Sequence, residues 1–262
     1  MMDEYITIKC DGSMPIVASA IHSGHLISEH LLPLLSLNKS DQLREEDPYT
    51  EIWTDISDNR IIAHHSRFEL DLNRPPEKAI YRIPSDSWGL RVWATTPSQR
   101  VLTGSLQKYK YIYERIQECL TGLLARFGVL VVYDLHSYNH RRGGPDATPE
   151  DAIFNPEINV GTGTMDRDYW APLVDRFIND LRNFNFQGRH LDVRENVKFK
   201  GGHFPKWIHE KFAGSVCCLS IEVKKFFMDE WTGEPDHMLI GGIGDGLRST
   251  LPGVLEELLR YK

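Results

Sequence analysis

Two segments of this chain are apolar on both faces of a strand, and this feature constrains the fold more than any other. Residues 129–132 read Val-Leu-Val-Val, and residues 216–223 are apolar except for Ser220 and Glu222. A strand without a polar face is typical of a mostly parallel sheet that helices cover on both sides. Shorter β-branched runs at residues 16–21 and 61–63 predict further strands.

Stretches with helical periodicity lie between these strands. In residues 106–123, 170–181 and 247–258, apolar side chains recur every three or four positions. The glycine-rich residues 242–246 are interpreted as a loop before the last helix. This alternation predicts a three-layer α/β/α sandwich with a mixed, mostly parallel central sheet, whose ligands gather at the carboxyl ends of the strands. Because no linker or repeat divides the chain, residues 1–262 are expected to form one domain.

Charge and missing motifs exclude several classes of function. The formal charge of -7 argues against nucleic-acid and anionic-membrane partners. No apolar run reaches the roughly 18 residues of a membrane span. The start of the chain does not resemble a secretory signal, and no CxxC pair occurs. A reducing cytoplasm is therefore the expected location. The chain lacks GxSxG, GxxxxGK[ST] and HExxH, which excludes the serine-hydrolase elbow, the P-loop and the thermolysin-like zinc site.

Two histidines stand where ligand sites form in such sheets. His22 follows the strand at residues 16–21, and His136 follows the strand at residues 128–133. Imidazole nitrogen suits Zn²⁺, and a catalytic zinc takes three protein ligands plus water. Asp134, two residues before His136, is placed to support that histidine from behind. The alternative is that each histidine is a hydrogen-bonded structural residue.

Three further charged features have both a structural and a functional interpretation. Residues 44–51 are dense in carboxylates and form either a solvated acidic turn or the source of a third metal ligand. Arg67 and Arg74 flank a predicted short strand and its exit, where guanidinium groups either grip a carboxylate or lie on the surface. Glu222 lies in an apolar run, where an ionised carboxylate is costly, so it is either ion-paired or a base with a perturbed pKa.

Taken together, these motifs resemble the N-formylglutamate amidohydrolases, a family similar in fold to the zinc carboxypeptidases and aspartoacylases. The resemblance extends from about residue 16 to residue 223. The Arg-x-x-x-Asp-Leu-Asn-Arg motif followed by Asp-x-His-Ser is its more specific part. The motifs that carry it, in order, are His22-Ser23-Gly24, Glu46-Asp47, Ser66-Arg67, Asp71-Leu72-Asn73-Arg74, Asp134-Leu135-His136-Ser137 and Glu222.

The resemblance implies one zinc ion per chain. His22 and His136 look like two of its ligands, and Asp47 matches the third best. Glu46 and Glu51 remain open as alternatives for that third position, because the acidic turn is crowded.

The resemblance also implies a substrate-binding set and a base. Asn73 and Arg74 look like the clamp on a substrate carboxylate, with Arg67 assisting. His203, after two glycines, corresponds to an aromatic residue that faces the site. Glu222 looks like the general base.

The implied activity is zinc-dependent hydrolysis of the amide bond of an N-acyl, above all N-formyl, acidic amino acid such as N-formylglutamate. A zinc carboxypeptidase or another acyl-amino-acid hydrolase would use the same residues, and a non-catalytic protein that binds a small acid is the alternative from another class. The sequence departs from the family pattern at Ile21, at His203 and in the basic residues 139–145. These departures concern the identity of the substrate and not the metal site. The expected partner is a small carboxylate substrate, and a homo-oligomer is left open.

Overall fold

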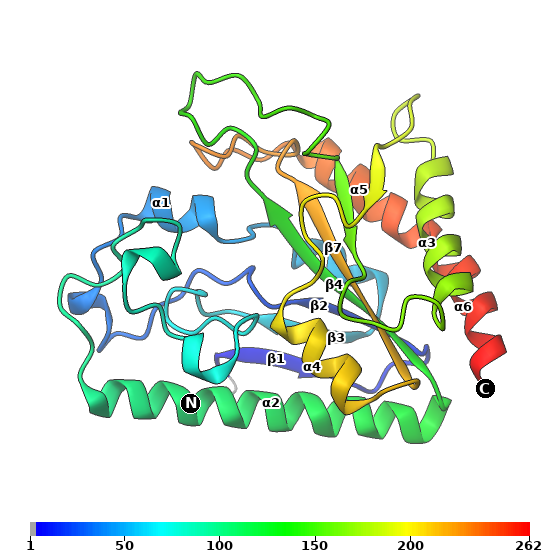
Figure 1. The fold of residues 1–262 in the computed structure, drawn as a ribbon, viewed down its shortest axis with the longest axis horizontal. Coiled ribbons are helices and arrows are strands. Elements are labelled where there is room, and N and C mark those ends of the chain that lie inside the picture. Colours follow the sequence, from blue (N-terminus) through cyan, green and yellow to red (C-terminus); the bar gives the residue numbers. More distant parts are fainter. Residues whose placement is uncertain (1–3) are drawn as a thin grey trace.

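The computed structural model describes residues 4–262, which form one seven-stranded sheet in the order β1-β3-β2-β4-β7-β5-β6 (Figure 1). Four of its six strand pairings are parallel, and the β1–β3 and β5–β7 pairings are antiparallel. This confirms the predicted mixed, mostly parallel sheet. The strands are β1 (Ile6–Lys9), β2 (Ile16–Ala20), β3 (Asn59–Ala63), β4 (Leu130–Tyr138), β5 (Ile158–Gly161), β6 (Val193–Glu195) and β7 (Val216–Lys224).

Helices cover both faces of the sheet and complete the predicted three layers (Figure 1). One core joins the sheet to α2 and α4, and the other joins it to α3, α5 and α6. The helices are α1 (Lys39–Glu45), α2 (Gln99–Phe127), α3 (Ala171–Asn183), α4 (His203–Lys211), α5 (His237–Ser249) and α6 (Leu251–Leu258). Short 3₁₀ turns occupy Leu32–Leu34, Ile52–Ile56, Pro76–Lys78, Pro84–Asp86 and Leu259–Tyr261.

The position of strand β4 between the two cores explains why its sequence has no polar face. Val131 and Tyr133 belong to one core, whereas Leu130 and Val132 belong to the other. The strand is longer than predicted, because β7 pairs beside it as far as Tyr138. His136 therefore lies inside a strand rather than after one.

The glycine-rich residues 242–246 are helical, so the predicted loop is wrong. They belong to α5, which begins at His237, and the predicted helix over residues 247–258 is divided between α5 and α6 near Thr250. A Cβ atom at Gly242 would lie 2.9 Å from the Phe186 ring, and one at Gly246 would lie 3.2 Å from the Phe184 ring. Close packing against these rings thus favours glycine and outweighs its low helix propensity.

Two of the four cysteines form a disulfide that the sequence did not indicate. Cys10, just after β1, is bonded to Cys119 of α2, with their Cα atoms 5.6 Å apart. The partners are 109 residues apart in sequence, so motif spacing carries no sign of the pairing. Cys217 and Cys218 are buried strand residues, as expected.

No helix within residues 4–262 combines the length and the apolar character that crossing a bilayer requires.

Candidate metal centre and its cavity

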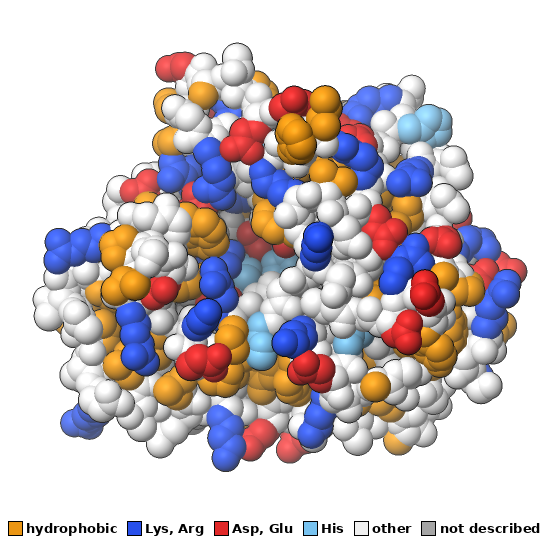
Figure 2. All heavy atoms as spheres, viewed as in Figure 1, with side chains coloured by type: hydrophobic (Ala, Val, Ile, Leu, Met, Phe, Trp, Pro, Cys, Tyr) orange, Lys and Arg blue, Asp and Glu red, His pale blue; other side chains and the backbone are white. Residues whose placement is uncertain are grey.

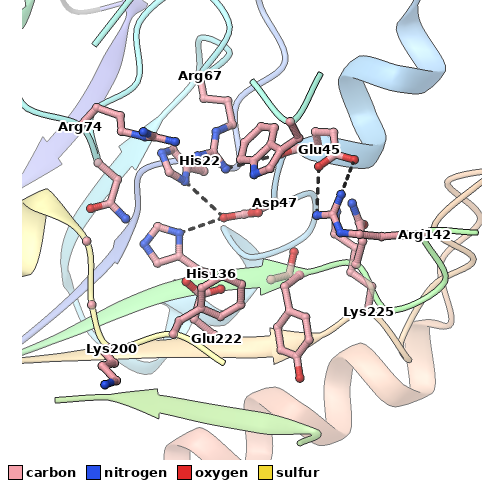
Figure 3. A pocket seen from close by; sticks show the side chains of 18 residues that line it. His22, Glu45, Asp47, Arg67, Arg74, His136, Arg142, Lys200, Glu222 and Lys225 are labelled. Atoms are coloured by element: carbon pink, nitrogen blue, oxygen red, sulfur yellow. Dashed lines mark hydrogen bonds and ion pairs between the residues drawn. The ribbon is translucent and has the colours of Figure 1, made fainter. Parts of the chain in front are cut away.

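His22, Asp47 and His136 meet at the carboxyl edge of the sheet. His22 follows β2, Asp47 follows α1 and His136 lies in β4, yet their ligand atoms are all within 4.8 Å of one another. Figure 3 shows both imidazoles turned toward the carboxylate: Nδ1 of His22 lies 3.4 Å from Oδ2 of Asp47, and Nδ1 of His136 lies 2.9 Å from it. The three side chains predicted as metal ligands therefore face one point.

A second carboxylate lies behind each histidine, hydrogen-bonded to His22 and at ion-pair distance from His136. Nε2 of His22 lies 2.7 Å from Oδ1 of Asp71, and Nε2 of His136 lies 3.0 Å from Oδ2 of Asp134. A carboxylate at one ring nitrogen takes its N–H and leaves the other nitrogen with a lone pair for a metal. The sequence predicts this support for Asp134. It misses the role of Asp71, although the Asp-Leu-Asn-Arg motif contains that residue.

The electrostatics of this centre fit a bound cation. Within residues 4–262, Nδ1 of His22 is buried without a hydrogen-bond partner. Burial acts to raise the pKa of Asp47, but the two imidazoles hold that pKa well below its usual range. Burial acts to lower the pKa of His136, but the carboxylates of Asp134 and Asp47 raise it well above the ordinary value. Positive charge is thus stabilised here, and two imidazoles with one carboxylate form a donor set that suits zinc.

A backbone hydrogen bond places Asp47, rather than its acidic neighbours, in the centre. The N–H of Asp47 donates to the carbonyl oxygen of His22 at 3.0 Å, which brings the acidic turn to the end of β2. The Glu46 carboxylate is buried and lies 2.6 Å from Nδ1 of His25. Glu51 precedes the 3₁₀ turn at Ile52–Ile56 and is not part of the cluster. The acidic segment is therefore largely buried, not a solvated turn.

A cavity of about 270 Å³ opens beside the three ligands. Figure 2 shows it as a hollow with Lys and Arg side chains around the opening and His and acidic side chains at its floor. Five basic side chains line it against three acidic ones, so the cavity attracts anions. The charged lining residues are Glu45, Asp47, Arg67, Arg74, Arg142, Lys200, Glu222 and Lys225.

Arg67 and Arg74 both reach this cavity, but from turns and not from the predicted strand. Residues 66–75 form successive turns and bends after β3. Nη2 of Arg67 donates to Oδ2 of Asp71 at 2.9 Å, and its guanidinium lies over the Trp88 ring. Within residues 4–262 the guanidinium of Arg74 has no hydrogen bond or ion pair, although it lies 5.9 Å from the Tyr81 ring. Arg74 is therefore free to bind an anion.

Asn73 is fixed between the turns and the start of α4. Its Oδ1 accepts a hydrogen bond from the N–H of Phe204 at 2.9 Å, and a Cβ atom at Gly202 would lie 2.2 Å from that oxygen. The amide nitrogen of Asn73 is left as a donor on the cavity wall.

His203 lies beside the cavity and not on its wall. It is the first residue of α4, and its ring centroid is 5.9 Å from that of Tyr113. Gly201 and Gly202 line the cavity instead. The glycines of the Gly-Gly-aromatic stretch thus face the site, whereas the aromatic position packs against α2.

Glu222 lies next to His136 in the paired strands β4 and β7. Its half-buried side chain lines the cavity and has no hydrogen-bond or ion-pair partner within residues 4–262. Burial raises the pKa of Glu222 to about 7, with the Asp47 and Asp134 carboxylates adding to the effect and His136 opposing it. The ion-paired interpretation is therefore not supported, and Glu222 has the pKa of a base that works near neutral pH.

The Asp134→Asn variant is expected to bind zinc 10- to 100-fold more weakly, on the order of magnitude usual for a lost carboxylate behind a metal-binding histidine. The amide keeps the shape and the hydrogen bond from Ser19 but removes the charge that orients His136. Zinc affinity measured by competition with a chelator checks this, with Asp58→Asn, an exposed carboxylate, as the control. An unchanged affinity would restrict Asp134 to a role in folding.

Comparison with known proteins identifies the family of this chain. The family model described as N-formylglutamate amidohydrolase matches residues 14–228. A crystal structure of N-formylglutamate amidohydrolase from Ralstonia eutropha is 18% identical, has a TM-score of 0.73 and covers 98% of this chain and 99% of its own. A gene product of Agrobacterium tumefaciens is 16% identical, with a TM-score of 0.71 and coverage of 99% and 98%. No curated protein sequence matches. Because the family model spans most of the chain, this protein belongs to the N-formylglutamate amidohydrolase family.

Proposed function

We propose that this protein is a zinc-dependent amidohydrolase that cleaves the amide bond of an N-acyl acidic amino acid, with N-formylglutamate as the first candidate. The observation that carries this proposal is one cavity lined by the His22, Asp47 and His136 centre together with Glu222 and Arg74, whose charged groups have no hydrogen-bond or ion-pair partner within residues 4–262. Family membership supports the amidohydrolase chemistry.

The metal and the base have separate tasks. A bound zinc ion supplies Lewis acidity, which polarises a carbonyl and makes water more acidic. Glu222 accepts the proton of the attacking water and then delivers it to the leaving amine nitrogen, a type of transfer worth about 10²–10⁴ in rate. Its raised pKa suits both directions of transfer.

Orientation comes from the turns after β3. Arg74 and the amide nitrogen of Asn73 would hold a substrate carboxylate, and Arg67 would add positive charge beside them. Asp71 links Arg67 to His22, since its Oδ1 atom contacts His22 and its Oδ2 atom contacts Arg67. A carboxylate held here lies close to the metal centre, as the α-carboxylate beside a scissile amide must.

A substrate panel tests the proposal. Zinc-loaded protein should hydrolyse N-formylglutamate faster than N-acetylglutamate and faster than peptides that end in glutamate. Preference for the peptides would favour a carboxypeptidase, and stoichiometric binding without turnover of any substrate would favour a binding protein.

The Arg74→Lys variant is expected to lower kcat/KM for N-formylglutamate by about 10- to 100-fold, because an ammonium cannot replace a guanidinium fork on a carboxylate. The same variant should change little for the analogue with an amidated α-carboxyl group. Steady-state kinetics on both substrates checks this. An equal loss on both would instead assign Arg74 a structural role.

A further inference from the structure

We propose that Arg142, together with Asn139, forms a second carboxylate subsite that selects substrates with an acidic side chain. This proposal rests on the proposed function and adds to it the residues that recognise the side-chain carboxylate of the substrate. The subsite lies in the same cavity as the metal centre, on the loop of residues 139–157 between β4 and β5.

Arg142 stands across the metal centre from Arg74. Figure 3 shows Arg74 on one side of His22 and Asp47, and Arg142 with Lys225 on the other. A ligand that spans the cavity would thus meet a guanidinium group at each end. The substrate class that matches is a dicarboxylate with its reactive amide between the two cationic ends.

One edge of the Arg142 guanidinium is already held in place. Its Nη1 and Nη2 atoms each lie 3.3 Å from an oxygen of Glu45, which is buried. Nε of Arg142 makes no hydrogen bond within residues 4–262, and the side chain remains 41% exposed. Glu45 therefore fixes the direction of the group and leaves donors for a ligand, since guanidinium carries five N–H groups.

Asn139 supplies a second, independent sign of a ligand. It is 3% exposed and lines the cavity, yet its Oδ1 is buried without a hydrogen-bond partner in the described part of the chain. A buried polar group without a partner calls for an explanation, and a bound ligand is one. Because the oxygen and nitrogen of an amide exchange places by a simple flip, Asn139 can present N–H donors to a carboxylate.

Lys225 adds positive charge next to this subsite. Its side chain is buried, and its Nζ donates to the carbonyl oxygens of Arg44 and Glu46 at 2.5 Å and 2.7 Å. Arg142 and Lys225 both line this end of the cavity, and the Glu45 carboxylate there already contacts Arg142. A substrate carboxylate would be attracted to these two cationic groups, whereas the neutral amide of a glutamine side chain would not. Sites built for a charged partner reject analogues that lack it.

The experiment compares two substrates that differ in one group, N-formyl-L-glutamate and N-formyl-L-glutamine. The zinc-loaded protein should prefer the glutamate substrate. The Arg142→Gln variant should lose about 10- to 100-fold in kcat/KM on N-formyl-L-glutamate, as expected for a lost charged hydrogen-bond pair, and stay within about threefold on N-formyl-L-glutamine.

Arg141→Gln is the matched control. Arg141 is the adjacent residue, but its guanidinium lies 3.4 Å from Asp229 and it does not line the cavity. This variant should keep the preference for glutamate. Inhibition by glutarate and by butyrate provides a second measurement, in which Arg142→Gln should weaken only the dicarboxylate.

Two results would overturn the proposal: equal losses of Arg142→Gln on both substrates, or a parent protein that does not distinguish them. A parent that hydrolyses no N-formyl amino acid would defeat the proposed function instead. In that case, direct binding of glutarate and butyrate to the parent and to Arg142→Gln still decides whether the subsite exists.

Discussion

The Glu222→Gln variant is expected to keep its zinc and its substrate affinity while kcat falls by about a hundredfold or more, the range for a lost general base. The amide has the size of the carboxylate but cannot accept the proton of the attacking water. Glu222 has no hydrogen-bond or ion-pair partner within residues 4–262, so the substitution removes basicity without breaking an ion pair.

Stability separates this role from a structural one. Burial raises the pKa of Glu222 from 4.5 to about 7 in the metal-free site, so its contribution to stability is present below pH 4.5 and lost as the pH rises through 7. Glu222→Gln has no such group to ionise, and the metal-free variant should therefore melt no earlier than the parent at pH 8. Thermal melting and kcat on the same protein check both statements. A variant that melts far earlier but turns over normally would remove Glu222 from the mechanism.

The His136→Ala variant is expected to bind zinc more than about a hundredfold more weakly, because loss of a ligand exceeds the 10- to 100-fold cost of losing the carboxylate behind one. His22 and Asp47 alone leave two donors, fewer than a catalytic zinc requires. Elemental analysis should find about one zinc per chain in the parent and a small fraction of that in the variant.

The control for this variant is His190→Ala, since His190 is exposed and does not belong to the cluster of His22, Asp47 and His136. It should hold as much zinc as the parent. Circular dichroism should show that His136→Ala retains its secondary structure. Equal zinc in His136→Ala and in the parent would reject the ligand assignment.

Much of this site could be predicted because it lies at strand ends that the sequence marks clearly. His22 follows an apolar strand, and Asp134 and Glu222 each interrupt one, so all three stand out against their neighbours. The sequence also indicated Arg67 and Arg74 after β3 as candidate anion-binding residues, but it did not predict the turns that carry them. Turns of this kind depend on long-range contacts, such as the one between Asn73 and Phe204.

The sequence by itself determined the layered fold and the types of residue at the edge that carries the candidate site, because apolar periodicity and strand ends are local properties. Only the tertiary structure decided that Asp47 joins the histidines, since its position depends on the hydrogen bond to His22. It also decided that residues 242–246 are helical, because the Phe184 and Phe186 rings that favour glycine there come from another segment. The pairing of Arg142 with Glu45 spans 97 residues and has no local signature. Contacts between distant segments set these features, and no pattern of neighbouring residues encodes them.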